Sequence, residues 1–304
     1  MDVRQVVTER IIAMLERGGN GYRERWTRAA ARGMPRNGKT GAPYRGVNVL
    51  LLWDAAMQAG YTSNVWLTYK QAAAVGAQVR RGEKAVLGVH FERRQRRDER
   101  ELADSEHEDS KAQKGYLVSL PFWVFNVAQI DGLPACVMAD VKGLPPGSDR
   151  TPIERAMRFI GGCQAHVQHG FDRAAFAPRV DRILMPDVDR FTSPEAYCAT
   201  ALHELVHWTG HPDRLARQFG QRFGDAAYAF EELVAELGAA FLLGHIGLVD
   251  ATIEGHAAYL DAWLEVLRHD RTAIFTAARL AGEAFEYIVA RRITFVEAPA
   301  GAVG

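Results

Sequence analysis

The sequence lacks the cysteine patterns of disulfide-rich and zinc-finger proteins. Its three cysteines, Cys136, Cys163 and Cys198, lie far apart and form no Cys-x-x-Cys pair. This spacing favours free thiols in a reducing compartment. No apolar run approaches the roughly 18 residues of a membrane-spanning helix. Residues 1–20 predict an amphipathic helix rather than a signal peptide, so we expect a cytoplasmic protein.

The sequence also has no net charge, but this total conceals two halves of opposite charge. Residues 1–100 carry 19 Lys and Arg against 9 Asp and Glu, whereas residues 101–304 carry 18 against 28. A basic front half joined to an acidic back half indicates a polyanionic partner for the first of them.

The length of 304 residues and the 48% of hydrophobic residues allow two domains with real cores. The segment Leu144-Pro-Pro-Gly147 is typical of a linker, so we place the domains at residues 1–147 and 148–304. Residues 93–114 are almost wholly polar and predict a mobile charged insertion. We therefore expect an α+β fold, with an α/β N-terminal domain and a mainly helical C-terminal domain that holds a small sheet.

The most informative motif is His203-Glu204-x-x-His207. On a helix, residues four apart lie on one face, so both imidazoles are directed at a single point. That supplies two of the three protein ligands of a catalytic zinc. Glu204 is then placed to accept a proton from the attacking water.

The surrounding residues predict the helix that this motif requires. Thr192-x-x-Glu195 has the form of a capping box, and Pro194 suits the first turn. Apolar residues recur at helical spacing up to His207, and Gly210 with Pro212 favours termination. We expect a helix over Pro194–Thr209.

Two segments are candidates for the third ligand. Asp213 completes His203-Glu-x-x-His-x-x-Gly-x-x-Asp, a metzincin-like spacing in which Gly210 lets the chain turn back. That class also needs a methionine turn below the metal, and all seven methionines precede residue 190. The alternative is a gluzincin-like carboxylate from a following, largely apolar helix. There Glu232 and Glu236 lie one turn apart, and we assign Glu232 as ligand and Glu236 as its supporting carboxylate, with exchanged roles possible.

In the basic half, aromatic rings alternate with cations along a Gly- and Pro-rich loop, residues 33–46, and the segments after it. Single-stranded nucleic acid needs faces for its bases to stack on and cations for its phosphates. The candidate DNA-binding residues are Arg36, Asn37, Lys39, Thr40, Tyr44, Arg45, Asn48, Trp66, Tyr69, Lys70, Arg80, Arg81 and Lys84.

Other elements follow from hydrophobic patterning. We expect helices at Val47–Ala59 and Pro152–Ile160, and separate strands at residues 116–120 and 122–130. Residues 182–186, just before the metal helix, are placed to form an edge strand that holds a peptide by backbone pairing.

Both halves together resemble the ArdC-type antirestriction proteins of conjugative plasmids, whose N-terminal module also occurs in TraC-type primases. The resemblance rests on residues 40–48, Trp66-Leu-Thr-Tyr-Lys-Gln71, residues 76–84, His203-Glu-Leu-Val-His-Trp-Thr-Gly-His211 with Arg214-Leu215, and residues 228–238. It implies an N-terminal domain that binds single-stranded DNA and a C-terminal zincin-like metallopeptidase domain. The implied role is protection of incoming plasmid DNA from the recipient's restriction system.

We therefore expect the protein to hold one Zn(II) per chain on His203, His207 and Glu232. Glu204 would be the general base, and Tyr228 or His256 could donate to the oxyanion. Its substrate would be a DNA-bound protein such as a restriction enzyme. The rival hypothesis is a DNA-masking protein whose metal site is structural or vestigial. A competent site is favoured because a purely structural site has no use for Glu204.

Overall fold

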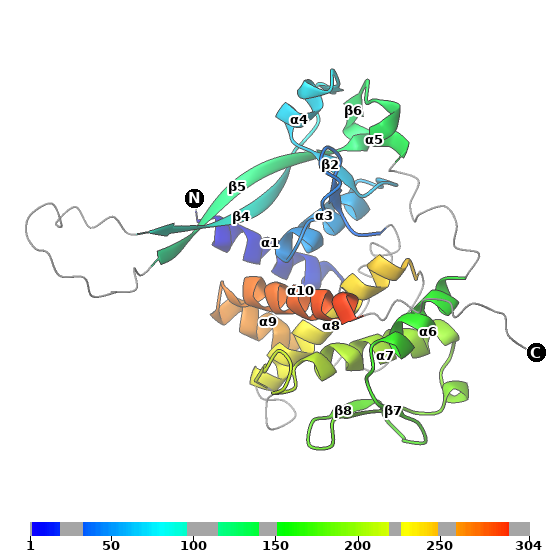
Figure 1. Cartoon of the computed structure of the whole chain (residues 1–304). Helices are drawn as coiled ribbons and strands as arrows, with labels where there is room; N and C mark the ends of the chain where they lie inside the picture. Colours follow the sequence, from blue (N-terminus) through cyan, green and yellow to red (C-terminus); the bar gives the residue numbers. More distant parts are fainter. Residues whose placement is uncertain are drawn as a thin grey trace, which may run out of the picture.

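The computed structural model describes residues 2–18, 33–95, 115–139, 151–218, 226–248 and 260–291. Most of the predicted insertion, the predicted linker and His256 lie outside these residues. The arrangement is α+β, as predicted, with a sheet-rich part above a helical part (Figure 1).

A four-stranded sheet of order β1-β2-β5-β4 organises the N-terminal half. Its strands are β1 (Arg36–Asn37), β2 (Val65–Leu67), β4 (Val86–Gln95) and β5 (Gly115–Asn126). The long antiparallel pair β4–β5 reaches out from the body of the molecule as a twisted ribbon (Figure 1).

The prediction of two strands within residues 116–130 is wrong, because β5 runs without interruption through Pro121. Pro121 lies opposite Val89, and the N–H and carbonyl of Val89 both bond to the Asn48 side chain at 2.8 Å. Those groups therefore point away from β5, so this pair needs no N–H from the proline. Asn48 closes the outer edge of β4 at this point.

Short elements surround this sheet. The helix α4 (Tyr69–Ala74) begins at a capping box in which Thr68 and Gln71 bond reciprocally. The other elements of this half are α1 (Val3–Gly18), α3 (Val47–Gln58), α5 (Ala135–Ala139), and the two-stranded sheet of β3 (Gln78–Val79) and β6 (Ile130–Asp131).

Helices dominate the C-terminal half. They are α6 (Pro152–Gly162), α7 (Pro194–Thr209), α8 (Ala226–Ile246), α9 (Leu260–His269) and α10 (Ala273–Arg291). Helix α7 packs between α8 and the small sheet, while α10 lies across α8 on the side of the N-terminal half (Figure 1).

The small sheet has the order β7-β9-β8, with β7 (Val167–Gln168), β8 (Ala175–Ala177) and β9 (Arg182–Leu184). The predicted edge strand at residues 182–186 is therefore wrong, because β9 is paired on both sides. The edge next to α7 belongs to β8, which approaches the helix directly.

The two halves share one core. A single buried cluster includes Val7 and Ile11 of α1, Trp53 of α3 and Phe241 of α8, and the last two rings lie 6.0 Å apart. Helix α1 packs on α9, and α10 packs on α3. The domain boundary at residue 148 remains a prediction, but the parts on either side of it bury apolar surface against each other.

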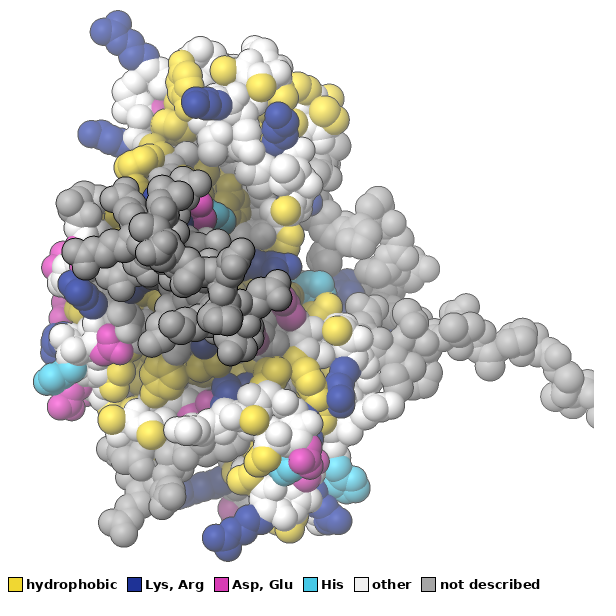
Figure 2. Space-filling model, turned by 60° about the vertical axis from the view of Figure 1, so that its left-hand side comes forward, with side chains coloured by type: hydrophobic (Ala, Val, Ile, Leu, Met, Phe, Trp, Pro, Cys, Tyr) yellow, Lys and Arg dark blue, Asp and Glu magenta, His cyan; other side chains and the backbone are white. Residues whose placement is uncertain are grey.

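Charged side chains are distributed unevenly over the face shown in Figure 2. In Figure 2, Lys and Arg side chains stand out from the upper lobe, whereas most of the visible Asp and Glu side chains lie lower. No helix in the described part of the chain combines the length and apolar character needed to cross a membrane.

Candidate functional site

Helix α7 carries the metal motif, and its bounds are those predicted. Its N-cap is Ser193, whose hydroxyl accepts from the Ala196 N–H, so the predicted capping box led by Thr192 is wrong by one residue. The helix is buried from Ala196 to Thr209. A buried helix holds its side chains in fixed rotamers, which suits a site that must keep its geometry.

The structure brings His203, His207 and Glu232 together. The two histidine Nε2 atoms lie 3.1 Å apart, and the Glu232 carboxylate lies 3.4 Å from one and 3.5 Å from the other. One ligand atom from each residue falls within 4.8 Å of the other two. Two imidazoles and a carboxylate are a donor set that fits Zn(II) and other divalent transition metals.

A close approach of α7 and α8 produces this convergence. Gly238 of α8 faces Val206 of α7, and a Cβ at Gly238 would lie 2.8 Å from a Val206 methyl carbon. Such a distance leaves no room for a larger residue unless the Val206 side chain or the helices move. The glycine thus lets the carboxylates of α8 reach the histidines of α7.

The other two candidate ligands lie elsewhere. Glu236 is 3.8 Å from His203 Nδ1, the nitrogen turned away from the convergence point. Asp213 is 86% exposed and lies beside His211. Gly210 has a φ of −77°, so it does not provide the left-handed turn that the metzincin-like reading needs.

The sequence analysis assigned no role in the site to two residues of the cluster, Glu231 and Arg217. Glu231 lies 3.2 Å from His207 Nδ1, and the Arg217 guanidinium donates to Glu231 at 2.8 Å. Arg217 also donates to Thr209 Oγ1 and to the Val206 carbonyl, and its side chain is only 3% exposed. The Glu231-Glu232 doublet was a usable signal for the first residue. No sequence signal marks Arg217.

Glu204 points to the edge of the small sheet. Its carboxylate accepts a hydrogen bond from the Phe176 N–H of β8 at 2.7 Å. An ion pair between Arg214 and Asp181 joins the segment after α7 to the β8–β9 connection. The candidate base and the edge strand β8 therefore lie side by side. Tyr228 is half-buried in the first turn of α8.

The protonation of each residue in the cluster depends on the charges of its neighbours. Burial alone would lower the pKa of His207, but hydrogen bonds with Glu231 and Glu232 and the charges of Glu232 and Glu204 raise it to about 10. Burial would raise the pKa of Glu232 and of Glu231, yet hydrogen bonds to the histidines, and to Arg217 for Glu231, lower both pKa values. Without metal, an imidazolium among carboxylates is therefore the favoured state.

This coupling predicts the pH dependence of stability in the chelated protein. The raised pKa of His207 contributes stability that is full below its ordinary value of 6.5 and is lost as pH rises toward 10. The lowered pKa of Glu232 contributes stability that is present above 4.5 and is lost as pH falls. Urea unfolding in excess chelator should therefore give a maximum between these values.

The control for this prediction is His207→Gln, which removes the titrating imidazole. Its unfolding free energy should lose the decline between pH 6.5 and 10 that His207 gives the wild type. The same decline in both proteins would show that other groups cause it.

The DNA-binding candidates divide by exposure. Trp66 is fully buried in β2 and packs against Tyr61, so the prediction that its ring stacks on a base is wrong. Pairing of β2 with β5 and packing against α3 place this ring in a buried apolar cluster, and burial of a large aromatic ring is favourable. Asn48 is committed to the β4 edge, as described above. The candidates whose side chains are exposed are Lys39, Thr40, Arg45, Tyr69, Lys70, Arg80, Arg81 and Lys84.

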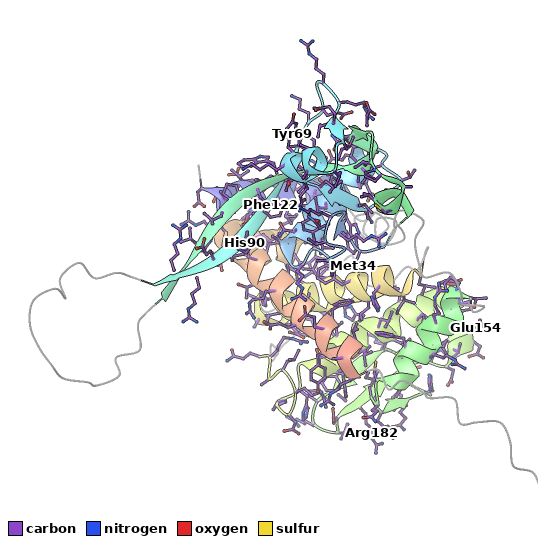
Figure 3. All side chains as sticks on the ribbon, turned by 45° about the horizontal axis from the view of Figure 1, so that its top comes forward. Met34, Tyr69, His90, Phe122, Glu154 and Arg182 are labelled. Carbon is purple, nitrogen blue, oxygen red and sulfur yellow. The ribbon has the colours of Figure 1, made fainter. Side chains whose placement is uncertain are left out.

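Some of these candidates also shape the surface. The Asn37 amide oxygen accepts from the N–H groups of Lys39 and Thr40, which fixes the loop. Tyr44 is half-buried and stacked on Phe122 at 6.2 Å, and burial raises its pKa. Tyr69 is 52% exposed at the outer end of the lobe (Figure 3).

The candidate arginines and lysines differ in how many hydrogen bonds and ion pairs they make within the protein. The Arg80 guanidinium donates to Glu83, Asp131 and the Ala128 carbonyl. Arg36 is half-buried in β1, whose backbone pairs with β2. Arg80 is exposed like Lys39 and Lys70, but its bonds to two carboxylates make it less available to a phosphate.

Comparison with known proteins gives two family matches. Residues 1–125 match the N-terminal domain of anti-restriction factor ArdC, and residues 154–280 match a zincin-like metallopeptidase family. The uncharacterized protein y4eC of Sinorhizobium fredii (strain NBRC 101917 / NGR234) is 38% identical over 96% of this chain and 92% of its own. DNA primase TraC of Escherichia coli is 36% identical over 93% of this chain, which spans only 27% of that primase.

Solved structures agree with these matches. The antirestriction protein ArdC of plasmid R388 is 36% identical, with a TM-score of 0.75 for its metal-free form over 96% of this chain and 98% of that one. Its Mn(II)-bound form gives 0.74 over 97% and 100%.

Proposed function

Because the chain belongs to the ArdC family of antirestriction proteins, we propose that it binds single-stranded DNA and carries a divalent-metal peptidase site. Both activities would serve to protect incoming plasmid DNA from restriction. The observation that carries the proposal is the convergence of two histidines and Glu232, with Glu204 beside them and outside the ligand set.

His203, His207 and Glu232 would hold the metal, one ion per chain. The related R388 protein has a Mn(II)-bound form, and we propose Zn(II) for this chain because its nitrogen and carboxylate donors are those of catalytic zinc. When bound, the metal supplies Lewis-acid activation of a water molecule and of the substrate carbonyl. Glu231 and Glu236 lie next to the outer nitrogens of the two histidines and would fix the orientation of the rings.

Glu204 would act as general base and then as general acid. Its carboxylate accepts the proton of the attacking water and passes it to the leaving amine. The Phe176 N–H holds this carboxylate in place from β8. A peptide that lies along β8 would be next to Glu204, so this strand can position the scissile bond. The protein substrate would be one that sits on the same DNA, such as a restriction enzyme.

The exposed cations and the Tyr44–Phe122 stack would hold the DNA. The family match over residues 1–125 and the resemblance to TraC primase support this assignment. Binding through phosphates and stacking predicts little sequence preference and a steep dependence on salt. DNA binding would then bring the peptidase site to proteins on the same strand.

Antirestriction by two variants tests which activity protects the DNA. We expect a Glu204→Gln variant to keep DNA binding and to lose most protection of a transferred plasmid. A variant with Tyr44, Arg45 and Lys70 changed to Ala should lose both DNA binding and protection. Full protection by Glu204→Gln, with loss in the triple variant, would instead favour a DNA-masking protein whose metal site is structural or vestigial.

A further inference from the structure

A cavity of about 690 Å³ lies between the N-terminal half and α10. The start of α3, the β4 strand and α1 line one side, and α10 lines the other. His90 marks the place where the ribbon meets α10 (Figure 3). The volume is within the range of pockets that hold small ligands. None of the sites described above includes it as a whole.

One part of the cavity suits a phosphate. Helix α3 starts at Gly46 without a capping side chain and without an acidic residue in its first turn. Its first N–H groups therefore favour an anion. Arg45 comes directly before it, and Arg279 lines the opposite wall.

The acidic residues of the cavity are each paired. Glu286 bonds to Arg45 at 3.2 Å, and these side chains are 51% and 76% exposed. Glu283 pairs with Arg279 one turn away on α10. Ion pairs between exposed side chains are weak in water, so a phosphate can replace a carboxylate beside either arginine. With Arg4, the lining holds three arginines against two glutamates.

Another part of the cavity suits a flat ring. Phe91 of β4 is 36% exposed and meets Phe275 of α10 edge to face, with ring centroids 5.5 Å apart. The Arg4 guanidinium lies 5.8 Å from the Phe91 ring on the same wall. A nucleobase stacks on such a ring whatever its sequence. Anion donors and an aromatic face in one cavity together match a nucleotide.

We propose that this cavity binds a nucleotide of single-stranded DNA, so that the strand passes from the loop at residues 36–45 to α10. The inference rests on the proposed DNA binding and extends it from the basic half to a surface shared by both halves. Helix α10 packs on α7 and α8, which carry the metal ligands. The DNA would thus contact the peptidase half itself.

Gly282 offers a test that removes no existing interaction. It lies in the middle of α10 on the cavity wall, and a Cβ placed there meets no atom within 4 Å. Gly282→Leu should place a bulky side chain in the cavity and improve helix propensity. The matched control is Gly161→Leu on α6, where a Cβ also meets nothing.

Binding of a fluorescent oligothymidine is measured for the wild type and both variants. Gly282→Leu should lose one stacked base and one phosphate contact, which should raise its dissociation constant about 10-fold or more. Gly161→Leu should bind as tightly as the wild type. Equal binding by all three proteins would overturn the cavity proposal and leave DNA binding intact. A wild type that binds no oligothymidine would overturn the proposed function as well.

A second measurement uses the wild-type protein, so it does not depend on a variant that folds. Oligothymidine carrying 5-iododeoxyuridine is photocrosslinked, and the attached peptides are identified by mass spectrometry. We expect crosslinks on Phe91 or Phe275. Crosslinks confined to residues 36–44 and 69–84, none of which lines the cavity, would overturn the proposal.

Discussion

A Glu232→Ala variant is expected to bind Zn(II) at least about 100-fold more weakly than the wild type. Removal of a carboxylate that merely orients a metal ligand costs about 10–100-fold in metal affinity, and removal of a direct ligand costs more. Glu232 is the carboxylate that faces both histidine Nε2 atoms. Competition with a chromophoric chelator at fixed pH gives the affinity directly.

Two further variants make this measurement decisive among the three candidate ligands. Glu236→Ala should weaken binding only within the 10–100-fold range of an orienting residue, since Glu236 faces the outer nitrogen of His203. Asp213→Ala should have no effect, because its carboxylate is exposed beside His211. A larger loss for Glu236→Ala or Asp213→Ala than for Glu232→Ala would transfer the ligand role to that residue.

An Arg217→Met variant is expected to lower the free energy of unfolding by about 3–5 kcal/mol, the usual cost of removing one partner of a buried ion pair. The guanidinium is the buried counter-charge of Glu231 and also bonds Thr209 and the Val206 carbonyl. Its loss leaves a carboxylate, a hydroxyl and a carbonyl without that donor in a buried site. Urea unfolding in excess chelator separates this effect from metal binding.

An exposed arginine provides the control for Arg217. Arg268 pairs with Glu16 between α9 and α1, and both side chains are about half exposed. An Arg268→Met change should cost no more than about 1 kcal/mol. Similar losses for Arg217→Met and Arg268→Met would mean that Glu231 finds another partner when Arg217 is absent.

The Arg217–Glu231–His207 chain also explains the role of the segment after α7. Residues 210–218 fold back along the metal helix, and the backbone N–H of Arg217 donates to the Gly210 carbonyl. Arg214 in the same segment is paired with Asp181 in the β8–β9 connection. One short segment thus connects the metal cluster with the strand that we propose to hold the substrate.

The sequence by itself determined the metal helix and the chemistry expected of it. Helical spacing of His203 and His207, apolar periodicity and a proline at the first turn are local properties, so the bounds Pro194–Thr209 could be read without a structure. The doublet at Glu231 and Glu232 marked the partner helix for the same reason. The uneven charge and the family motifs pointed to DNA.

Tertiary structure alone decided the partners of those residues. Which carboxylate faces the histidines depends on the packing of α7 against α8 at Gly238, over 30 residues from Val206. Trp66 became a core residue because β2 pairs with β5, a contact between segments far apart in the chain. The position of Arg217, the placement of β8 at the sheet edge and the cavity at α10 have no local signature. They arise where distant segments meet, and local propensity carries no information about such contacts.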